Sequence, residues 1–404
     1  MPNNAANPSF QARVRGLLHG VAFGDAIGAP VERLTAAQIK EQYTRVERLD
    51  IPWHRAGADG KGPGGRTRSN GICTDDTLMM LSLMRVYNTL GRHIDAWDMA
   101  GELNREIAWT PMYIAELQRD AMLVERLFYP DKIIYTRLQL AACDPRQGGV
   151  GNMVNCGAAM YIAPVGVANA CDPRAAYNEA VEFALGQQQS YGVEAAGALA
   201  AAIAAAFVPG TSVTTIIDEV LAVTKDGTRD AIEAIAEAAV KLRAAGAGYD
   251  EVVAKFHEII ARYSSVGDDL IHTKEKAGRA TNNYQPSRLG SIEELPIALG
   301  FCVRNDGDFR VSVLDGINSG RDTDSIGSMV GSVLGAMHGE GGVTADELNA
   351  INTINRFDLN ASADAFSKTA LAILATDEEE ANRRLAQRTA LLGSSPLAAA
   401  KAAE

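Results

Sequence analysis

The chain has 404 residues, of which 47% are hydrophobic and 22% are charged, and it carries a formal net charge of −12. This composition is typical of an ordered globular protein with a large core. The acidic balance, without any block of Lys or Arg, argues against a nucleic-acid backbone as the main partner, because phosphate binding needs a basic face.

The sequence shows no clear motif for secretion, membrane insertion, disulfide pairing or zinc binding. The amino terminus has no apolar signal core, and the longest apolar run, Ala198–Val208, is too short to cross a bilayer, so we expect a cytoplasmic protein with no membrane partner. The five cysteines follow no CxxC spacing, and the six histidines form no HExxH pair. We therefore expect reduced thiols and no transition-metal site of the zinc kind.

The first distinctive segment is GDAIGAPVE at residues 24–32, where an apolar helix ends at glycine and proline. Asp25 lies inside this apolar stretch and needs a partner, for which a backbone or loop hydrogen bond is the simplest. Glu32 follows the break, which makes it a candidate for general acid or base work in a cleft. Thr35 and Gln38 then form a capping box that predicts another helix start.

A glycine-rich polar loop, Gly57–Gly71, comes before a helix that we predict over Thr77–Leu90. Loops of this length are often functional, and the cations Lys61, Arg66 and Arg68 are either solvated or fold over a phosphate-bearing substrate. The helix is apolar on almost every face, which is typical of a central helix surrounded by others.

Two acidic clusters stand at predicted helix starts. Thr74-Asp75-Asp76-Thr77 joins the glycine loop to the apolar helix, and Asp322-Thr323-Asp324-Ser325 opens a second one. Either cluster alone is explained by helix capping, which favours acidic and hydroxyl side chains. Both together supply more oxygen ligands than two caps need, and hard cations such as Mg²⁺ take carboxylates, hydroxyls and waters.

Helical periodicity dominates the rest of the chain, and alternating β-type runs are scarce. We therefore predict an all-α protein with one domain, 1–404, whose core covers about 12–375 and whose tail covers about 380–404. Glycines at every fourth position from 327 to 335 predict a closely crossed helix pair. Further helices are predicted over Gly192–Phe207, Arg229–Gly246 and Asp324–His338, and after a capping box of Thr344 with Glu347.

Four motifs, in chain order, resemble the ADP-ribosylglycohydrolase family. They are GDAIGAPVE, TDDTLMM, NCGAAMYIAPVG at residues 155–166, and GRDTDSIGSMVGSVLGAMHG at residues 320–339. The resemblance covers roughly residues 12–340. It implies a compact, orthogonal all-α bundle with a binuclear Mg²⁺ centre at helix starts, with Mn²⁺ as an alternative metal.

The resemblance also implies roles for individual residues. Glu32, Asp75 and Asp76 would be catalytic, and Asp25 would support the site without binding the metal itself. The metal ligands would be Thr74, Asp75, Asp76, Asp322, Asp324 and Ser325, and the substrate-binding residues would be Asn155, Cys156, Gly157, Tyr161 and Arg321.

The chain departs from the family pattern around the expected substrate. Many members have a glycine-asparagine pair where this chain has Asn155-Cys156, and Tyr161 replaces an arginine. Gln187–Gln189 occupy the place of an expected histidine, and Arg321 stands where glycine often precedes the aspartates. These changes leave the expected metal ligands intact and alter the ribose and base surroundings.

The resemblance implies a Mg²⁺-dependent hydrolase that cleaves the glycosidic bond at the anomeric carbon of an ADP-ribosyl group. Its partner would be a small-molecule or ADP-ribosylated substrate. Two alternatives stay open, a hydrolase of a smaller ribosyl N-glycoside such as a nucleoside-like metabolite, and a non-catalytic metal-binding relative. The leaving group and the oligomeric state also stay open.

Overall fold

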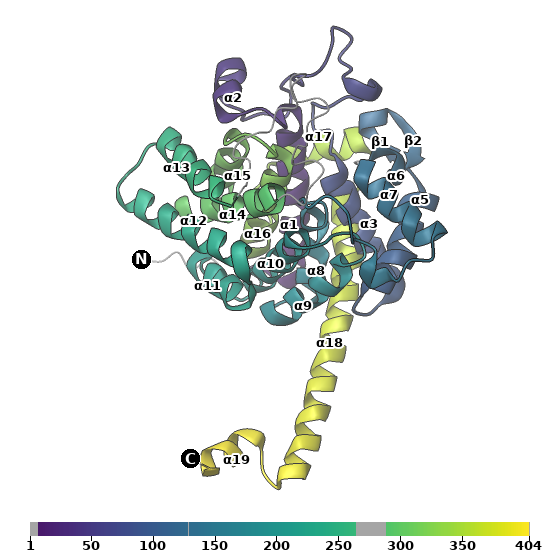
Figure 1. The fold of residues 1–404 in the computed structure, drawn as a ribbon, viewed down its shortest axis with the longest axis vertical. Coiled ribbons are helices and arrows are strands. Elements are labelled where there is room, and N and C mark those ends of the chain that lie inside the picture. The colour runs from purple at the N-terminus through teal and green to yellow at the C-terminus, as the bar shows by residue number, and fades with distance from the viewer. Residues whose placement is uncertain (1–6, 128, 264–287, 404) are drawn as a thin grey trace.

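The computed structural model describes residues 7–127, 129–263 and 288–403, and these residues are mainly helical (Figure 1). The predicted all-α class is confirmed. One antiparallel hairpin interrupts the helices, formed by β1 (Pro111–Ile114) and β2 (Arg119–Met122) with Pro111 opposite Met122. The helices are α1 (Phe10–Gly28), α2 (Ala36–Tyr43), α3 (Asp75–Leu90), α4 (Ala96–Asp98), α5 (Asn104–Trp109), α6 (Leu123–Arg126), α7 (Tyr129–Leu140), α8 (Ala163–Ala168), α9 (Pro173–Ala184), α10 (Tyr191–Ala206), α11 (Val213–Val223), α12 (Asp226–Ala244), α13 (Tyr249–Ala261), α14 (Arg288–Arg304), α15 (Phe309–Asn318), α16 (Thr323–His338), α17 (Ala345–Asn355), α18 (Leu359–Leu392) and α19 (Pro396–Ala403).

The predicted helix starts agree closely with the structure. Thr35 caps α2 and Thr344 caps α17, each in a complete capping box. The apolar helix predicted over Thr77–Leu90 is α3, and the alanine-rich one is α10. Short helical turns fill several connections, namely η1 (Ala29–Val31), η2 (Pro63–Gly65), η3 (Met99–Leu103), η4 (Ala115–Leu117), η5 (Pro145–Gln147) and η6 (Ala159–Tyr161).

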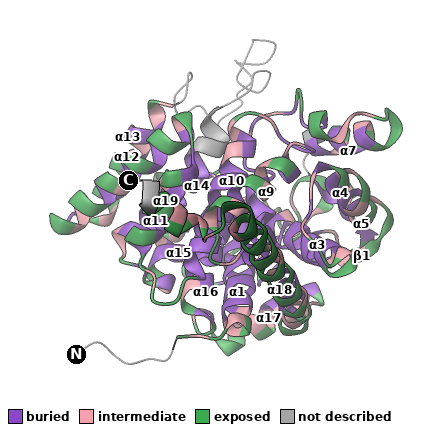
Figure 2. Ribbon diagram, turned by 90° about the horizontal axis from the view of Figure 1, so that it is seen from below, coloured by how far each residue is buried: buried purple, intermediate pink, exposed green. Residues whose placement is uncertain are grey.

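The centre of the molecule is a close crossing of α1 and α16, which lie among buried helices in Figure 2. Glycines recur every fourth residue on α1 and face the glycines of α16. A Cβ added at Gly20 would lie 2.1 Å from the carbonyl oxygen of Gly331, and one added at Gly24 would lie 2.2 Å from that of Gly327. The predicted close crossing is therefore present, and its partner is a second glycine stripe at Gly16, Gly20, Gly24 and Gly28.

The C-terminal part of the chain is a continuous helix that leaves the body. α18 packs against α1 and α3 with its first half, and its second half projects away and leads to α19 (Figure 1). Ile373 is the last buried residue of α18. His93 fastens the helix near this point, with its Nε2 atom 3.0 Å from Asp377 and its Nδ1 atom 2.6 Å from Glu179 on α9. The helix therefore runs without a break through the start of the predicted tail.

Among the described helices, none combines the length and the hydropathy that a membrane crossing requires.

Candidate metal centre

Asp25 joins the end of α1 to the start of α3. Its buried carboxylate accepts hydrogen bonds from the backbone N–H of Thr74 at 2.9 Å, from the N–H of Thr77 at 3.2 Å and from the Thr77 hydroxyl at 2.5 Å. The N-cap residue Thr74 makes no capping hydrogen bond with its own side chain. Asp25 therefore caps α3 from another helix, which fixes the first acidic cluster against α1.

The start of α16 is held against the segment that follows α1. The backbone N–H of Arg33 donates to the carbonyl of Arg321 at 2.7 Å, and the N–H of Arg321 donates to the carbonyl of Leu34 at 2.6 Å. The hydroxyl of Thr323 donates to the carbonyl of Gly28 at 2.8 Å. These bonds bring Glu32 beside the second acidic cluster, although roughly 290 residues separate them in sequence.

The two acidic clusters meet at one place. Carboxylate oxygens of Asp25, Asp76 and Asp324 lie within 4.8 Å of one another, and so do oxygens of Glu32, Asp322 and Asp324. Burial raises the pKa of Asp76 and of Asp324 well above the ordinary value, and the neighbouring carboxylates raise both further. Concentrated, buried negative charge of this kind is costly unless a cation or protons neutralise it.

Two buried carboxylate oxygens without hydrogen-bond partners among the described residues indicate whether a divalent cation fits this site. Within the described part of the chain, the Oδ1 atoms of Asp76 and Asp324 are buried without a hydrogen-bond partner. Nearly all buried polar atoms in proteins have a partner. Together with the hydroxyls of Thr74 and Ser325, which are also buried, the site offers only oxygen donors, as Mg²⁺ or Mn²⁺ prefers. The residues therefore fit a divalent cation.

Two buried arginines balance the outer side of this centre. Arg68 lies between Glu32 and Glu116, and Arg126 lies between Glu116 and Asp75, where its Nη1 atom is 2.7 Å from the Asp75 carboxylate. Glu116 is fully buried on η4. Burial alone would raise the pKa of Glu32, but the charges of Arg68 and Arg33 outweigh it and lower the pKa to about 2.

The roles of Glu116 and Arg126 were not visible in the sequence. Both follow the glycine loop, and nothing in their spacing indicates a buried ion network. Arg68 was expected to be either a solvated or a substrate-facing charge of the loop, but its side chain is only 7% exposed and is bonded to carboxylates. A buried ion network depends on tertiary packing, so only the folded chain reveals it.

A cavity of about 470 Å³ opens above the acidic centre. Its floor includes Asp75, Asp76, Asp322, Asp324 and Ser325, and Thr74 is buried beside them. Its wall carries cationic and apolar side chains, so the cavity combines an acidic floor with a basic rim. These wall residues are Arg33, Arg55, Arg66, Lys132, Trp53, Leu127, Met153 and Met160.

The five expected substrate-binding residues divide into two groups. Asn155, Cys156 and Gly157 line the cavity, and the Asn155 carboxamide oxygen accepts from the Gln188 side chain at 2.7 Å. Tyr161 and Arg321 do not line it. The Tyr161 hydroxyl donates to Gln187, and the Arg321 guanidinium donates to Glu293 at 2.6 Å.

Asp131 on α7 is another acid of the cavity, and no motif or spacing in the sequence indicated it. Its carboxylate is 4% exposed and accepts from the side chains of Gln187 at 3.3 Å and Asn152 at 3.4 Å. Burial raises the pKa of Asp131 to about 6, so this carboxyl group carries a proton in mildly acidic solution. Glu32 and Asp131 therefore line the same cavity, but the pKa of Glu32 is lowered and that of Asp131 is raised.

Comparisons with known proteins match nearly the whole chain. The family model described as ADP-ribosylglycohydrolase matches residues 6–383. The uncharacterized protein YegU of Escherichia coli (strain K12) is 24% identical over 369 residues, which cover 88% of this chain and 96% of YegU. The solved structure of an ADP-ribosylglycohydrolase-related protein complex is 20% identical, with a TM-score of 0.56 over 89% of this chain and 99% of that one, and so has the same fold. By the extent of the family match, the chain belongs to the ADP-ribosylglycohydrolase family.

Proposed function

We propose that this protein is a divalent-cation-dependent glycosidase that hydrolyses the bond at the anomeric carbon of an ADP-ribosyl group. The observation that carries the proposal is the cavity itself, whose acidic floor lies beside Glu32 and whose rim is basic. Membership of the family supports the same reaction class.

Thr74, Asp75, Asp76, Asp322, Asp324 and Ser325 would hold two Mg²⁺ ions, which Mn²⁺ could replace. When bound, the ions would supply positive charge for the ribose hydroxyls and make a nearby water more acidic. The protein contributes rigidity, because Asp25 and the α1–α16 crossing fix both helix starts before any ligand arrives.

Glu32 would orient the attacking water and accept its proton. Its low pKa keeps it ionised at neutral pH, which suits a base or a positioning group and does not suit an acid that protonates the leaving group. Arg68 donates a hydrogen bond to this carboxylate and holds it in place. The low basicity of Glu32 makes positioning its main contribution.

Asp131 would supply the proton to the leaving group. It lines the same cavity, and its raised pKa lets it carry a proton at a pH where Glu32 has lost one. Two carboxyl groups with separated pKa values are the usual requirement for cleaving a glycosidic bond through an oxocarbenium-like transition state.

The basic rim favours an ADP-ribosyl group over a smaller ribosyl N-glycoside. Within the described residues, the cationic groups of Arg55, Arg66 and Lys132 form no ion pair with a carboxylate, so their charge is available to a pyrophosphate. Trp53 and the neighbouring methionines offer apolar surface for a base. A nucleoside would leave the cations at the rim without a partner.

The test is turnover of a substrate panel in the presence of Mg²⁺, with the Asp75→Asn protein as control. The panel holds ADP-ribosylated arginine, ADP-ribosylated serine, O-acetyl-ADP-ribose and several nucleosides. We expect release of ADP-ribose from at least one ADP-ribosyl compound and none from Asp75→Asn. Turnover of nucleosides alone would establish the smaller substrate class, and no turnover despite tight Mg²⁺ binding would identify a non-catalytic relative.

A further inference from the structure

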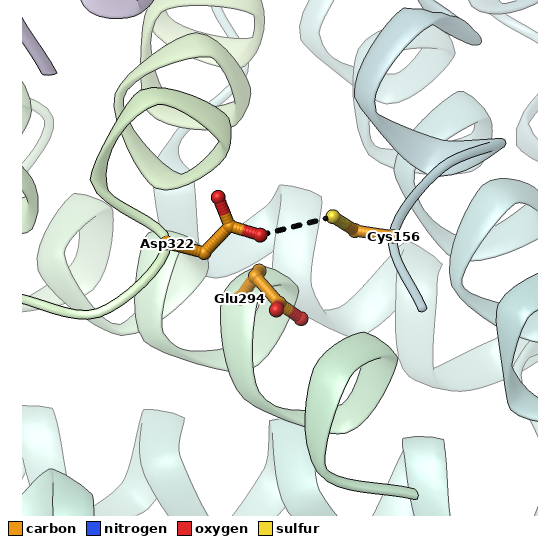
Figure 3. A group of neighbouring side chains, drawn as sticks. All are labelled: Cys156, Glu294 and Asp322. Carbon is orange, nitrogen blue, oxygen red and sulfur yellow. Dashed lines mark hydrogen bonds between the residues drawn. The ribbon is translucent and has the colours of Figure 1, made fainter. Parts of the chain in front are cut away.

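A second group of possible ligands lies against the inner wall of the cavity. Cys156 comes from the loop before η6, Asp322 is the residue just before α16, and Glu294 belongs to α14 (Figure 3). One ligand atom from each of the three residues lies within 4.8 Å of the other two. The Cys156 thiol donates to the Asp322 Oδ2 atom at 3.3 Å, as the dashed line in Figure 3 marks.

Glu294 supplies an independent indication that something binds at this point. Glu294 is 5% exposed. Within the described chain its Oε2 atom has no hydrogen-bond partner. The neighbouring cation, Arg321, donates to Glu293 at 2.6 Å. A buried carboxylate oxygen without a partner is costly, and a directly bound cation removes that cost.

The chemistry of the three donors differs from that of the neighbouring centre. Thr74, Asp76 and Ser325 offer oxygen, whereas Cys156 adds sulfur, a ligand that Mg²⁺ avoids and Zn²⁺ prefers. Zinc bonds of about 2.0–2.3 Å in a tetrahedron separate neighbouring ligand atoms by roughly 3.5 Å. The observed thiol–carboxylate distance of 3.3 Å is close to this separation, and a Glu294 oxygen lies within 4.8 Å of both atoms.

Although the spacing of the cysteines and histidines predicted no site of the zinc kind, we propose that Cys156, Glu294 and Asp322 form a binding site for a thiophilic divalent cation of the zinc class. The site has three protein ligands, which leaves one position for water or a substrate atom. Cys156 and Asp322 line the cavity, whereas Glu294 does not, so the open position faces the cavity. Asp322 is also one of the residues that would hold the Mg²⁺ ions in the neighbouring centre of oxygen ligands. Zinc bound at Cys156 and Glu294 would therefore compete with Mg²⁺ for the Asp322 carboxylate.

Titration of the full-length protein with Co²⁺, in excess Mg²⁺, tests the site without measuring turnover. Sulfur ligation gives a charge-transfer band in the near ultraviolet, which oxygen ligation does not. We expect the wild-type protein to develop this band with one equivalent of Co²⁺, and added Zn²⁺ to abolish it. Cys156→Ser should lose the band, and Glu294→Gln should bind Co²⁺ at least about 10-fold more weakly.

Two matched variants separate this site from the proposed hydrolytic centre. Cys171→Ser removes an exposed thiol elsewhere and should keep the band. Asp76→Asn removes a ligand of the oxygen-only centre and should keep the band too, even if it abolishes turnover. Absence of the band in the wild-type protein, its persistence in Cys156→Ser, or unchanged Co²⁺ affinity in Glu294→Gln overturns the proposal, whatever the substrate panel gives.

Discussion

The guanidinium group of Arg68 lies 2.5 Å from a carboxylate oxygen of Glu32 and 2.8 Å from one of Glu116. The side chain of Glu32 is 21% exposed, whereas that of Arg68, which lines the same cavity, is 7% exposed. Arg68 therefore fixes both the direction and the charge of Glu32.

Replacing Arg68 with methionine should move the acid limb of the pH–rate profile to higher pH. Burial would then act on Glu32 with less opposing positive charge, so its pKa would rise from about 2 and the ionised form would be lost at a higher pH. The profile of kcat/KM against pH measures this. Arg68→Lys, which keeps the charge, is the control, and an unmoved acid limb in folded Arg68→Met would contradict the role given to Arg68.

Replacing Asp131 with asparagine should remove the alkaline limb near pH 6 and reduce kcat by about 10²–10⁴-fold for a leaving group that needs a proton. Asparagine retains an oxygen that can accept from Gln187 and Asn152, so the fold should survive. A substrate that releases a nitrophenolate needs no proton and should be cleaved at nearly the wild-type rate. Equal losses on both substrates would exclude Asp131 as the proton donor.

Removal of the metal should lower the stability of the wild-type protein more than that of Asp76→Asn. Asp76 is buried with an unpartnered oxygen beside Asp25 and Asp75, and without a cation its charge opposes folding. We expect metal-free Asp76→Asn to be at least as stable as the metal-free wild type. Saturating Mg²⁺, at about 100 times its Kd, should stabilise the wild type by about 2.7 kcal/mol and the variant by much less. Thermal unfolding with and without EDTA measures both, and equal Mg²⁺ stabilisation would remove Asp76 from the ligand set.

Gly24→Ala should lower the free energy of unfolding by at least about 1–3 kcal/mol, because its Cβ would lie 2.2 Å from the backbone of Gly327. Gly101→Ala is the matched control, since that glycine also lies in a helical segment and its Cβ would have nothing within 4 Å. The control should be neutral or slightly stabilising. Urea unfolding of the two variants checks the difference, and equal stabilities would mean that α1 and α16 separate at little cost.

Stability should fall at alkaline pH through His93. Its hydrogen bond to Glu179 raises the pKa of His93 to about 9 from an ordinary value of 6.5, so the protonated form is favoured in the folded state. The contribution is complete below about pH 6.5 and is lost as the pH rises through about 9. Between about pH 6 and pH 10, the wild-type melting temperature should therefore fall further than that of His93→Gln. Parallel falls in the two proteins would show that the link between α9 and α18 contributes nothing through charge.

Local signals in the sequence predicted much of the fold and part of the site. Capping boxes and apolar periodicity identified α2, α3 and α17 because those signals lie within a few residues of each helix start. Both acidic clusters were recognisable for the same reason. The burial of Glu116 between two arginines and the approach of Glu294 to Cys156 were not predictable, since each depends on segments that meet only after packing. The stripe of glycines on α1 was present in the sequence, but only the structure pairs it with α16.

The crossing of α1 and α16 also has a consequence for biosynthesis. Almost every residue of α1 from Val14 onward is buried in the folded protein, and the helix that covers its glycine stripe begins roughly 300 residues later. At a synthesis rate of about 5–20 residues per second, α1 waits on the order of 15–60 s for that partner to leave the ribosome. During this interval the nascent chain exposes an apolar helix and an incomplete set of carboxylates, so a chaperone that shelters α1 should raise the yield of native protein, and metal loading can only follow translation of α16.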